Sequence, residues 1–130
     1  MPRQITLTDL QLAVVRVLWT RGESTVLEVQ GALLPERPLA QTTVATLLTR
    51  LEKRGIVSHR TDGRLFVYSA EVSEPDVRRS MVAELTEMLF DGNRAALISH
   101  LIDSRDIKKR DLDEVKRIIE AAERKDGHAR

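Results

Sequence analysis

Hydrophobic residues in the N-terminal part of the chain recur at the spacing of two amphipathic helices. The first helix is predicted to begin after Thr8, because Gln11 stands at the capping-box position, and to end at Gly22. A second, shorter helix is predicted after Thr25, which has Glu28 at the same capping distance, and the prolines that follow close it. The apolar side of the first helix consists of Leu12, Val15, Leu18 and Trp19.

The pattern over residues 41–54 predicts a third helix with two unlike sides. Its apolar side consists of Val44, Leu47, Leu48 and Leu51. The other side carries Gln41, Thr42, Ala45, Thr46 and Thr49. A solvated helix surface would normally carry Glu and Lys, which are better helix formers than threonine. Two β-like runs follow at 56–61 and 64–69, and the Asp62-Gly63 pair between them is a strong hairpin signal.

From residue 73 onward, three apolar stripes at helical spacing predict a helical region, with a break at Asp91-Gly92. The segment that carries these apolar faces is too short to bury them in a core of its own. Packing against a partner chain is therefore favoured over packing back onto the N-terminal part. We therefore expect two domains, 1–72 and 73–130, the second forming a homodimer. The expected dimer contacts are Val77, Met81, Leu85, Met88, Leu97, Leu101, Leu112, Val115 and Ile119.

Composition excludes several classes of protein. The chain of 130 residues has no cysteine, so disulfides, thiolate metal sites and cysteine nucleophiles are excluded. With 42% hydrophobic residues the chain can bury a core. No apolar run reaches the roughly 18 residues that a membrane span needs, and the sequence shows no secretory signal. We expect a cytoplasmic protein that does not insert into a membrane.

The net charge of +1 conceals a local excess of basic residues. Between positions 50 and 64, five basic residues stand against two acidic ones. The basic residues are Arg50, Lys53, Arg54, Arg60 and Arg64. Phosphate is attracted to such a patch, although an ordinary solvated surface gives similar counts. The location of these basic residues beside the predicted third helix and hairpin favours phosphate binding over an ordinary charged surface.

Three helices followed by a hairpin is the order of a winged helix-turn-helix, a mainly α fold with a small β hairpin. A recognition helix over 41–54 would enter a major groove about 12 Å wide, and short side chains would let its backbone approach the base edges. Residues 41–46, with Gln41, Thr42 and Thr46 on the small-residue side, are expected to read bases. Phosphate contacts are expected from Arg50, Lys53 and Arg54, and from Arg60 and Arg64 on a wing over 56–69.

The main alternative is a winged-helix module that mediates protein interaction and dimerises without binding DNA. An enzyme is not expected, because no Gly-rich phosphate loop, Ser/His/Asp arrangement or carboxylate pair is present. His59 is expected to face solvent or phosphate. His100 and Asp103 share one helix side and could form half of a metal site, but no third ligand is evident. No metal or cofactor is therefore expected.

The chain resembles the penicillinase-repressor family, the BlaI, MecI and CopY group of winged-helix repressors, over nearly its whole length. The most specific segment is TTVATLLTRLEKRGIVSHRTDGRLFVYS, preceded by LTDLQLAVVRVLW and ESTVLEVQGAL. Its part RLEKRGIV also occurs in other winged-helix regulators. The resemblance implies a homodimeric repressor that binds a palindromic operator in double-stranded DNA, with Thr43, Thr46 and Arg50 contacting the DNA and the helical C-terminal part forming the dimer.

Two features depart from the family pattern. The metal-responsive branch carries a cysteine cluster near the C-terminus, and this chain has none, so the resemblance does not extend to copper sensing. In the antibiotic-responsive branch, proteolysis at an Asn-Phe bond in the dimer region inactivates the repressor. His100 and Leu101 stand at that bond here. The resemblance thus implies cleavage by a membrane sensor protease at a bond whose residues differ from the pattern.

Overall fold

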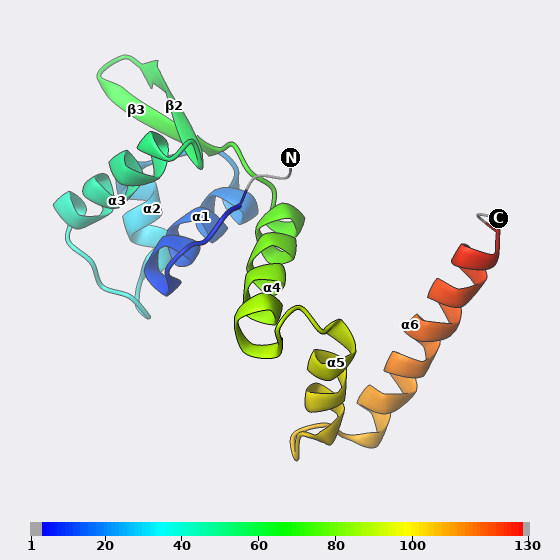
Figure 1. The fold of residues 1–130 in the computed structure, drawn as a ribbon. Coiled ribbons are helices and arrows are strands. Elements are labelled where there is room, and N and C mark those ends of the chain that lie inside the picture. The colour runs from blue at the N-terminus through cyan, green and yellow to red at the C-terminus, as the bar shows by residue number, and fades with distance from the viewer. Residues whose placement is uncertain (1–3, 129–130) are drawn as a thin grey trace. The chain divides into compact units, whose positions relative to one another are not determined.

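The structure is a computed structural model that describes residues 4–128, and it is mainly helical with one small sheet (Figure 1). The chain divides into two compact units between Ala83 and Glu84. The first contains α1 (Asp9–Arg21), β1 (Ser24–Thr25), α2 (Val26–Leu33), α3 (Gln41–Lys53), β2 (Val57–Asp62), β3 (Leu65–Ala70) and the beginning of α4 (Glu74–Phe90). The second contains the rest of α4, α5 (Arg94–Asp103) and α6 (Lys109–His128).

The local signals that predict the first two helices are confirmed. Thr8 and Gln11 form a reciprocal capping box at the start of α1, and Gly22 ends the helix with a φ of 86°. Thr25 and Glu28 form the same arrangement at the start of α2. Each box satisfies two backbone N–H groups that have no partner within the helix, so the helix starts are determined locally.

The sheet has three antiparallel strands in the order β1-β3-β2, one more strand than the predicted hairpin. In the hairpin, His59 pairs with Tyr68 and Asp62 with Leu65, and Gly63 in the turn has a φ of 62°. The extra strand β1 has two residues, Ser24 and Thr25, and pairs with Tyr68 and Val67 in the middle of β3. The predicted fold class, a winged helix-turn-helix followed by a helical region, is confirmed.

The core of the first unit is formed by the apolar sides of the three helices and the inner side of the sheet. Its most deeply buried side chains are Val14, Val15, Val29, Val44, Leu48, Leu51, Ile56 and Val57. Burial of each leucine side chain contributes about 2 kcal/mol. The Trp19 indole lies against this core, and its Nε1 donates to the Val72 carbonyl over 2.9 Å. The first part of α4 joins the same core through Val77, which is 2% exposed.

The second unit buries few of its side chains. Among its described residues only Thr86 is buried, and α5 has no buried residue. The predicted break is confirmed, since α4 ends before Asp91-Gly92, where φ is 49° and 79°, and Asn93 caps α5. The exposed apolar side chains are Leu85, Met88, Leu89, Ile98, Leu101, Ile102, Ile118 and Ile119. Much of the apolar surface of the second unit therefore remains solvent-exposed in the isolated chain.

Candidate nucleic-acid interface

Helix α3 buries one side and exposes the other. Val44, Leu48 and Leu51 are 0% exposed, and they anchor the helix to the core. The exposed residues of the opposite side are Gln41, Thr42, Thr43, Thr46, Thr49, Arg50 and Lys53. The side chains predicted to meet DNA from this helix are therefore accessible together on one surface. The predicted extent is nearly right, since Arg54 is the C-cap residue.

Two threonines of α3, Thr46 and Thr49, satisfy their hydroxyl hydrogens within the helix. Thr46 Oγ1 donates to the Thr42 carbonyl and Thr49 Oγ1 to the Ala45 carbonyl, each over 2.9 Å. Thr46 then presents a methyl group and an oxygen that can still accept a hydrogen bond. This surface suits base edges, where a cytosine or adenine amino group donates and a thymine methyl makes apolar contact.

The N-terminus of α3 carries no side-chain cap. Ala40 is the N-cap residue, and no side chain in the described part of the chain bonds the first-turn N–H groups. The preceding loop is held by Gln30, whose Nε2 donates to the Leu39 carbonyl over 2.9 Å. Exposed N–H groups at a helix start favour a phosphate oxygen. The beginning of the predicted recognition helix is thus suited to the DNA backbone.

The predicted basic contacts divide into two groups in the structure. Arg50, Lys53 and Arg64 are exposed, and their side chains form no hydrogen bond or ion pair with any residue that the structure describes. Arg54 differs, because its Nη2 donates to the Thr6 carbonyl over 2.6 Å and its Nη1 to Gln11 Oε1 over 3.3 Å. These bonds fix the end of α3 to the segment that starts α1.

Arg60 also bonds within the chain. Its Nε and Nη2 donate to the two carboxylate oxygens of Glu23 over 3.0 and 2.8 Å. This hydrogen bond lowers the pKa of the Glu23 carboxyl group, and the same pair raises the pKa of Arg60. Because Glu23 precedes β1, the pair ties the hairpin to the end of α1.

His59 does not face solvent as predicted. Its Nδ1 lies 2.6 Å from Glu52 Oε1, and its ring stacks on Phe66 with centroids 4.1 Å apart. Tyr68 lies beside this stack, and burial raises the pKa of its hydroxyl group. Sequence reasoning missed Glu52 as a partner because the contact joins a helix to a strand. The only available signal was the hairpin register, which places residues 59, 66 and 68 on one side of the sheet.

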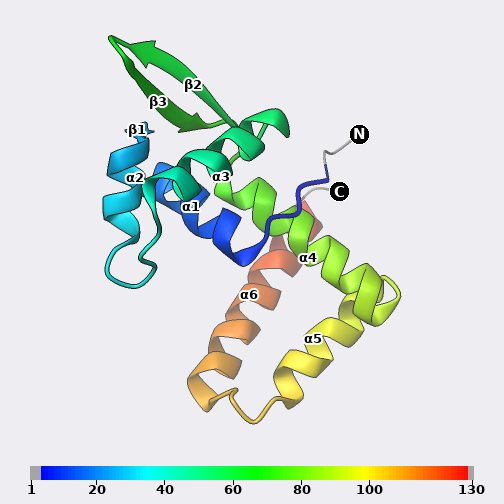
Figure 2. The ribbon, with the colours of Figure 1, turned by 90° about the vertical axis from the view of Figure 1, so that its left-hand side faces the viewer.

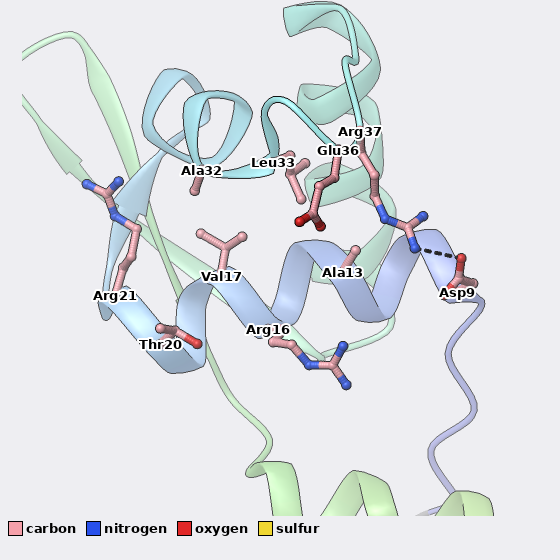
Figure 3. A pocket seen from close by; sticks show the side chains of 10 residues that line it. All are labelled: Asp9, Ala13, Arg16, Val17, Thr20, Arg21, Ala32, Leu33, Glu36 and Arg37. Carbon is pink, nitrogen blue, oxygen red and sulfur yellow. Dashed lines mark hydrogen bonds and ion pairs between the residues drawn. The ribbon is translucent and has the colours of Figure 1, made fainter.

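A groove of about 330 Å³ lies between α1, α2 and the loop after α2, and none of its lining residues is a predicted DNA contact (Figure 3). Its apolar floor includes Ala13, Val17 and Leu33, and charged side chains surround it. At one end the Arg37 Nη2 donates to the Asp9 carboxylate over 2.8 Å. No group of three potential metal ligands occurs among residues 4–128, and no helix in that range could span a membrane.

The family model for the penicillinase repressor matches residues 7–121. The chain belongs to the penicillinase repressor family. It is 24% identical to the penicillinase repressor of Bacillus licheniformis over 114 residues, which cover 88% of this chain and 89% of that protein. It is 20% identical to the methicillin resistance regulatory protein MecI of Staphylococcus aureus strain N315, over 82% of this chain and 86% of that protein. The resemblance seen in the sequence is confirmed, and this is a family of transcriptional repressors, not of enzymes.

Solved structures agree with the fold. The DNA-binding domain of the repressor BlaI shares 32% identity and a TM-score of 0.51, covering 58% of this chain and 93% of that domain. Monomeric BlaI from Bacillus licheniformis in complex with the blaP half-operator shares 32% identity and a TM-score of 0.50. The match again covers 58% of this chain and 93% of that chain. The regulator Tm0710 from Thermotoga maritima covers 92% of this chain at 20% identity and a TM-score of 0.51, which shows similarity of fold alone.

Proposed function

We propose that this chain is a homodimeric transcriptional repressor that binds a palindromic operator through α3 and the wing formed by β2 and β3. The observation that carries the proposal is the exposed side of α3, where short polar side chains lie beside Arg50 and Lys53. Both basic side chains are unbonded within the described residues. Membership of the penicillinase repressor family supports repression, and not activation, of transcription.

The proposed contacts differ in kind. Gln41, Thr42, Thr43 and Thr46 would contact base edges in the major groove, because they are short and exposed. Phosphate contacts would come from Arg50, Lys53 and Arg64, which need not break a bond to make them. Arg54 and Arg60 would have to break their hydrogen bonds to Thr6 and Glu23 before they could bind phosphate. We therefore assign them chiefly to stabilising the fold of the first unit.

The second unit would supply the dimer. Most of its large apolar side chains are exposed in the isolated chain, and a second copy would bury them. Two modules held on half-sites one helical turn apart, or a multiple of it, account for specific affinity better than one module alone. The predicted contacts Leu85, Met88, Leu97, Leu101, Leu112, Val115 and Ile119 belong to this proposal. Val77 and Met81 already pack against the core of the first unit.

Release of the operator is proposed to follow cleavage between His100 and Leu101 by a membrane sensor protease. Both residues are exposed on α5, which buries no side chain, so local opening of this helix would be easy. Co-expression with a candidate protease encoded nearby, followed by intact-mass measurement of the fragments, would locate the cut. An uncut chain that still releases DNA under inducing conditions would contradict this step.

The function is tested by selecting a binding site from random DNA duplexes and measuring affinity by fluorescence anisotropy at increasing salt. Affinity should fall steeply with salt, with a slope that reflects several phosphates. In the variant Arg50→Ala/Arg64→Ala, affinity should fall and the slope should become shallower by roughly 2. The control Arg16→Ala/Arg124→Ala removes the same charge from exposed positions outside the proposed interface.

Three outcomes would contradict the proposal. If no duplex is enriched, or if binding does not depend on salt, the chain is a protein-interaction module and not a DNA-binding repressor. If both double variants weaken binding equally, the effect comes from net charge, and the assignment of the interface is wrong.

A further inference from the structure

The wing is attached to the rest of the first unit on both of its sides. Adjacent residues of β2 point to opposite sides of the sheet, so His59 and Arg60 lie on different sides. Arg60 meets Glu23 at the end of α1, and His59 meets Glu52 on α3. Beyond these residues the hairpin projects from the module, as Figure 2 shows. The side chain of Arg64, at the turn, forms no hydrogen bond or ion pair with residues 4–128 that would orient it.

The contact between α3 and the wing has well-defined geometry. His59 Nδ1 lies 2.6 Å from Glu52 Oε1 and 2.9 Å from Oε2, so the carboxylate accepts the Nδ1–H. The imidazole ring stacks on Phe66 of β3 at an interplanar angle of 21°. The pair is only partly exposed, at 27% for His59 and 34% for Glu52. One side chain of α3 therefore holds both strands of the wing, β2 directly and β3 through the stack.

The presence of an acidic residue at this position needs a reason. Glu52 lies on α3 between Arg50 and Lys53, the two side chains proposed to bind phosphate. A carboxylate beside a phosphate-binding surface repels DNA. If charge were all that mattered, Glu52 would weaken binding. The bond to His59 gives it a different role.

We propose that Glu52 and His59 are positioning residues for DNA binding, and that their hydrogen bond sets the direction of the wing relative to α3. Arg64 then reaches the DNA at a fixed distance from the groove that α3 enters. This inference rests on the proposed function. It assigns no DNA contact to Glu52 or His59 themselves.

A double-mutant cycle separates positioning from charge. Glu52→Ala removes both the charge and the acceptor, whereas Glu52→Gln removes the charge and keeps an acceptor oxygen. In the wild type, Arg64→Ala should weaken binding by about 5-fold. In the Glu52→Ala background, Arg64→Ala should weaken DNA binding by less than about 2-fold, because Arg64 is no longer held where it contacts the DNA. In the Glu52→Gln background most of the Arg64 effect should remain.

The opposite pattern would overturn the proposal. If Glu52 acts only by repulsion, both replacements bind DNA more tightly by a similar factor, and Arg64→Ala costs the same in every background. Arg50→Ala serves as the matched control. Because Arg50 lies on α3 itself, its effect should be the same in the Glu52→Ala background.

A measurement without DNA tests the positioning directly. The sequence has no cysteine, so spin labels at Ala32→Cys on α2 and Leu65→Cys on the wing are site-specific. Full-length labelled chain is diluted with an excess of unlabelled chain, so that nearly every dimer with a label carries it on one copy alone. The distance distribution should be narrow in the wild type and in Glu52→Gln. It should broaden in Glu52→Ala and in His59→Leu, while His59→Asn, which keeps a donor near the Nδ1 position, should stay close to the wild type.

The two proposals can fail separately. If the wild type binds no duplex but the distribution broadens in Glu52→Ala, the proposed function is wrong and the wing contact is still real. If the wild type binds DNA and the distribution stays narrow in Glu52→Ala and His59→Leu, the positioning role is wrong. Circular dichroism of each variant excludes unfolding as the cause of broadening.

Discussion

At the residue scale, two arginines near the end of α3 have the same charge and different tasks. The Arg50 side chain is exposed and unbonded within the described residues. Arg54 lies one turn further along and donates to the Thr6 carbonyl and to Gln11. A guanidinium group that is already bonded must lose those bonds before it can hold a phosphate. The neighbours of each arginine therefore decide its role.

This difference predicts that one alanine substitution changes stability and the other changes the salt dependence of DNA binding. Arg54→Ala should lower the free energy of unfolding by about 1 kcal/mol through loss of its hydrogen bonds, and should leave the salt slope of DNA binding nearly unchanged. Arg50→Ala should leave stability unchanged within about 0.5 kcal/mol and make the salt slope shallower. Urea unfolding and fluorescence anisotropy measure the two quantities. A shallower slope for Arg54→Ala with unchanged stability would return Arg54 to the DNA-contacting group.

At the element scale, short local arrangements fix the helix starts, and the start of α2 depends on an ionised side chain. Backbone and side-chain hydrogen bonds with Thr25 lower the pKa of Glu28 below its usual value of 4.5. A carboxyl group whose pKa is lower in the folded state contributes stability above its unfolded pKa, and that stability is lost as the pH falls through the folded value. Helix α2 should therefore weaken on the acid side of pH 4.5.

The variant Glu28→Gln tests this pH dependence. Glutamine keeps an acceptor for the Thr25 N–H but does not titrate, so the capping box persists without its pH response. Between about pH 6 and about pH 3 the variant should lose less stability than the wild type, measured by urea unfolding at each pH. The control Glu36→Gln removes an exposed carboxyl group for which no hydrogen bond or ion pair occurs among the described residues. An acid response for Glu28→Gln equal to that of the wild type would contradict the prediction.

At the scale of the whole molecule, the two units differ in how they satisfy their apolar residues. The first unit buries its own in a core, whereas the second leaves most of its apolar side chains exposed. Ile119 of α6, for example, is 48% exposed. This contrast supports the proposal that the second unit completes its packing against another copy of the chain.

A charge placed on the exposed apolar side of α6 should separate the proposed dimer. Ile119→Lys should shift the molecular mass in sedimentation equilibrium from dimer to monomer and weaken operator binding by at least about 10-fold, because only one half-site is then held. Ala121→Lys is the matched control, since it adds the same charge roughly 200° further round the helix. Equal mass and affinity for the wild type and Ile119→Lys would place the dimer contacts elsewhere.

The sequence determined the features that depend on neighbouring residues. Capping boxes, positive-φ glycines and the hairpin turn act over a few positions, so the winged-helix order and the exposed threonines of α3 could be predicted from their spacing. The turn lies at Gly63-Arg64, one residue later than the predicted Asp62-Gly63 pair, because Asp62 pairs with Leu65. The two-residue strand β1 was not predicted, because it exists only through pairing with β3. The family resemblance was recognised in the sequence, and the family model confirms it over residues 7–121.

The tertiary structure decided which charged side chains are available. Arg60 bonds Glu23, a residue far from it in the sequence, and Arg54 bonds the segment before α1. Glu52, which on charge alone opposes DNA binding, lies against His59 when the wing folds onto α3. A side chain's charge is set by its type, but its free capacity to bind depends on the groups that folding brings within hydrogen-bond distance. Sequence spacing does not contain that information.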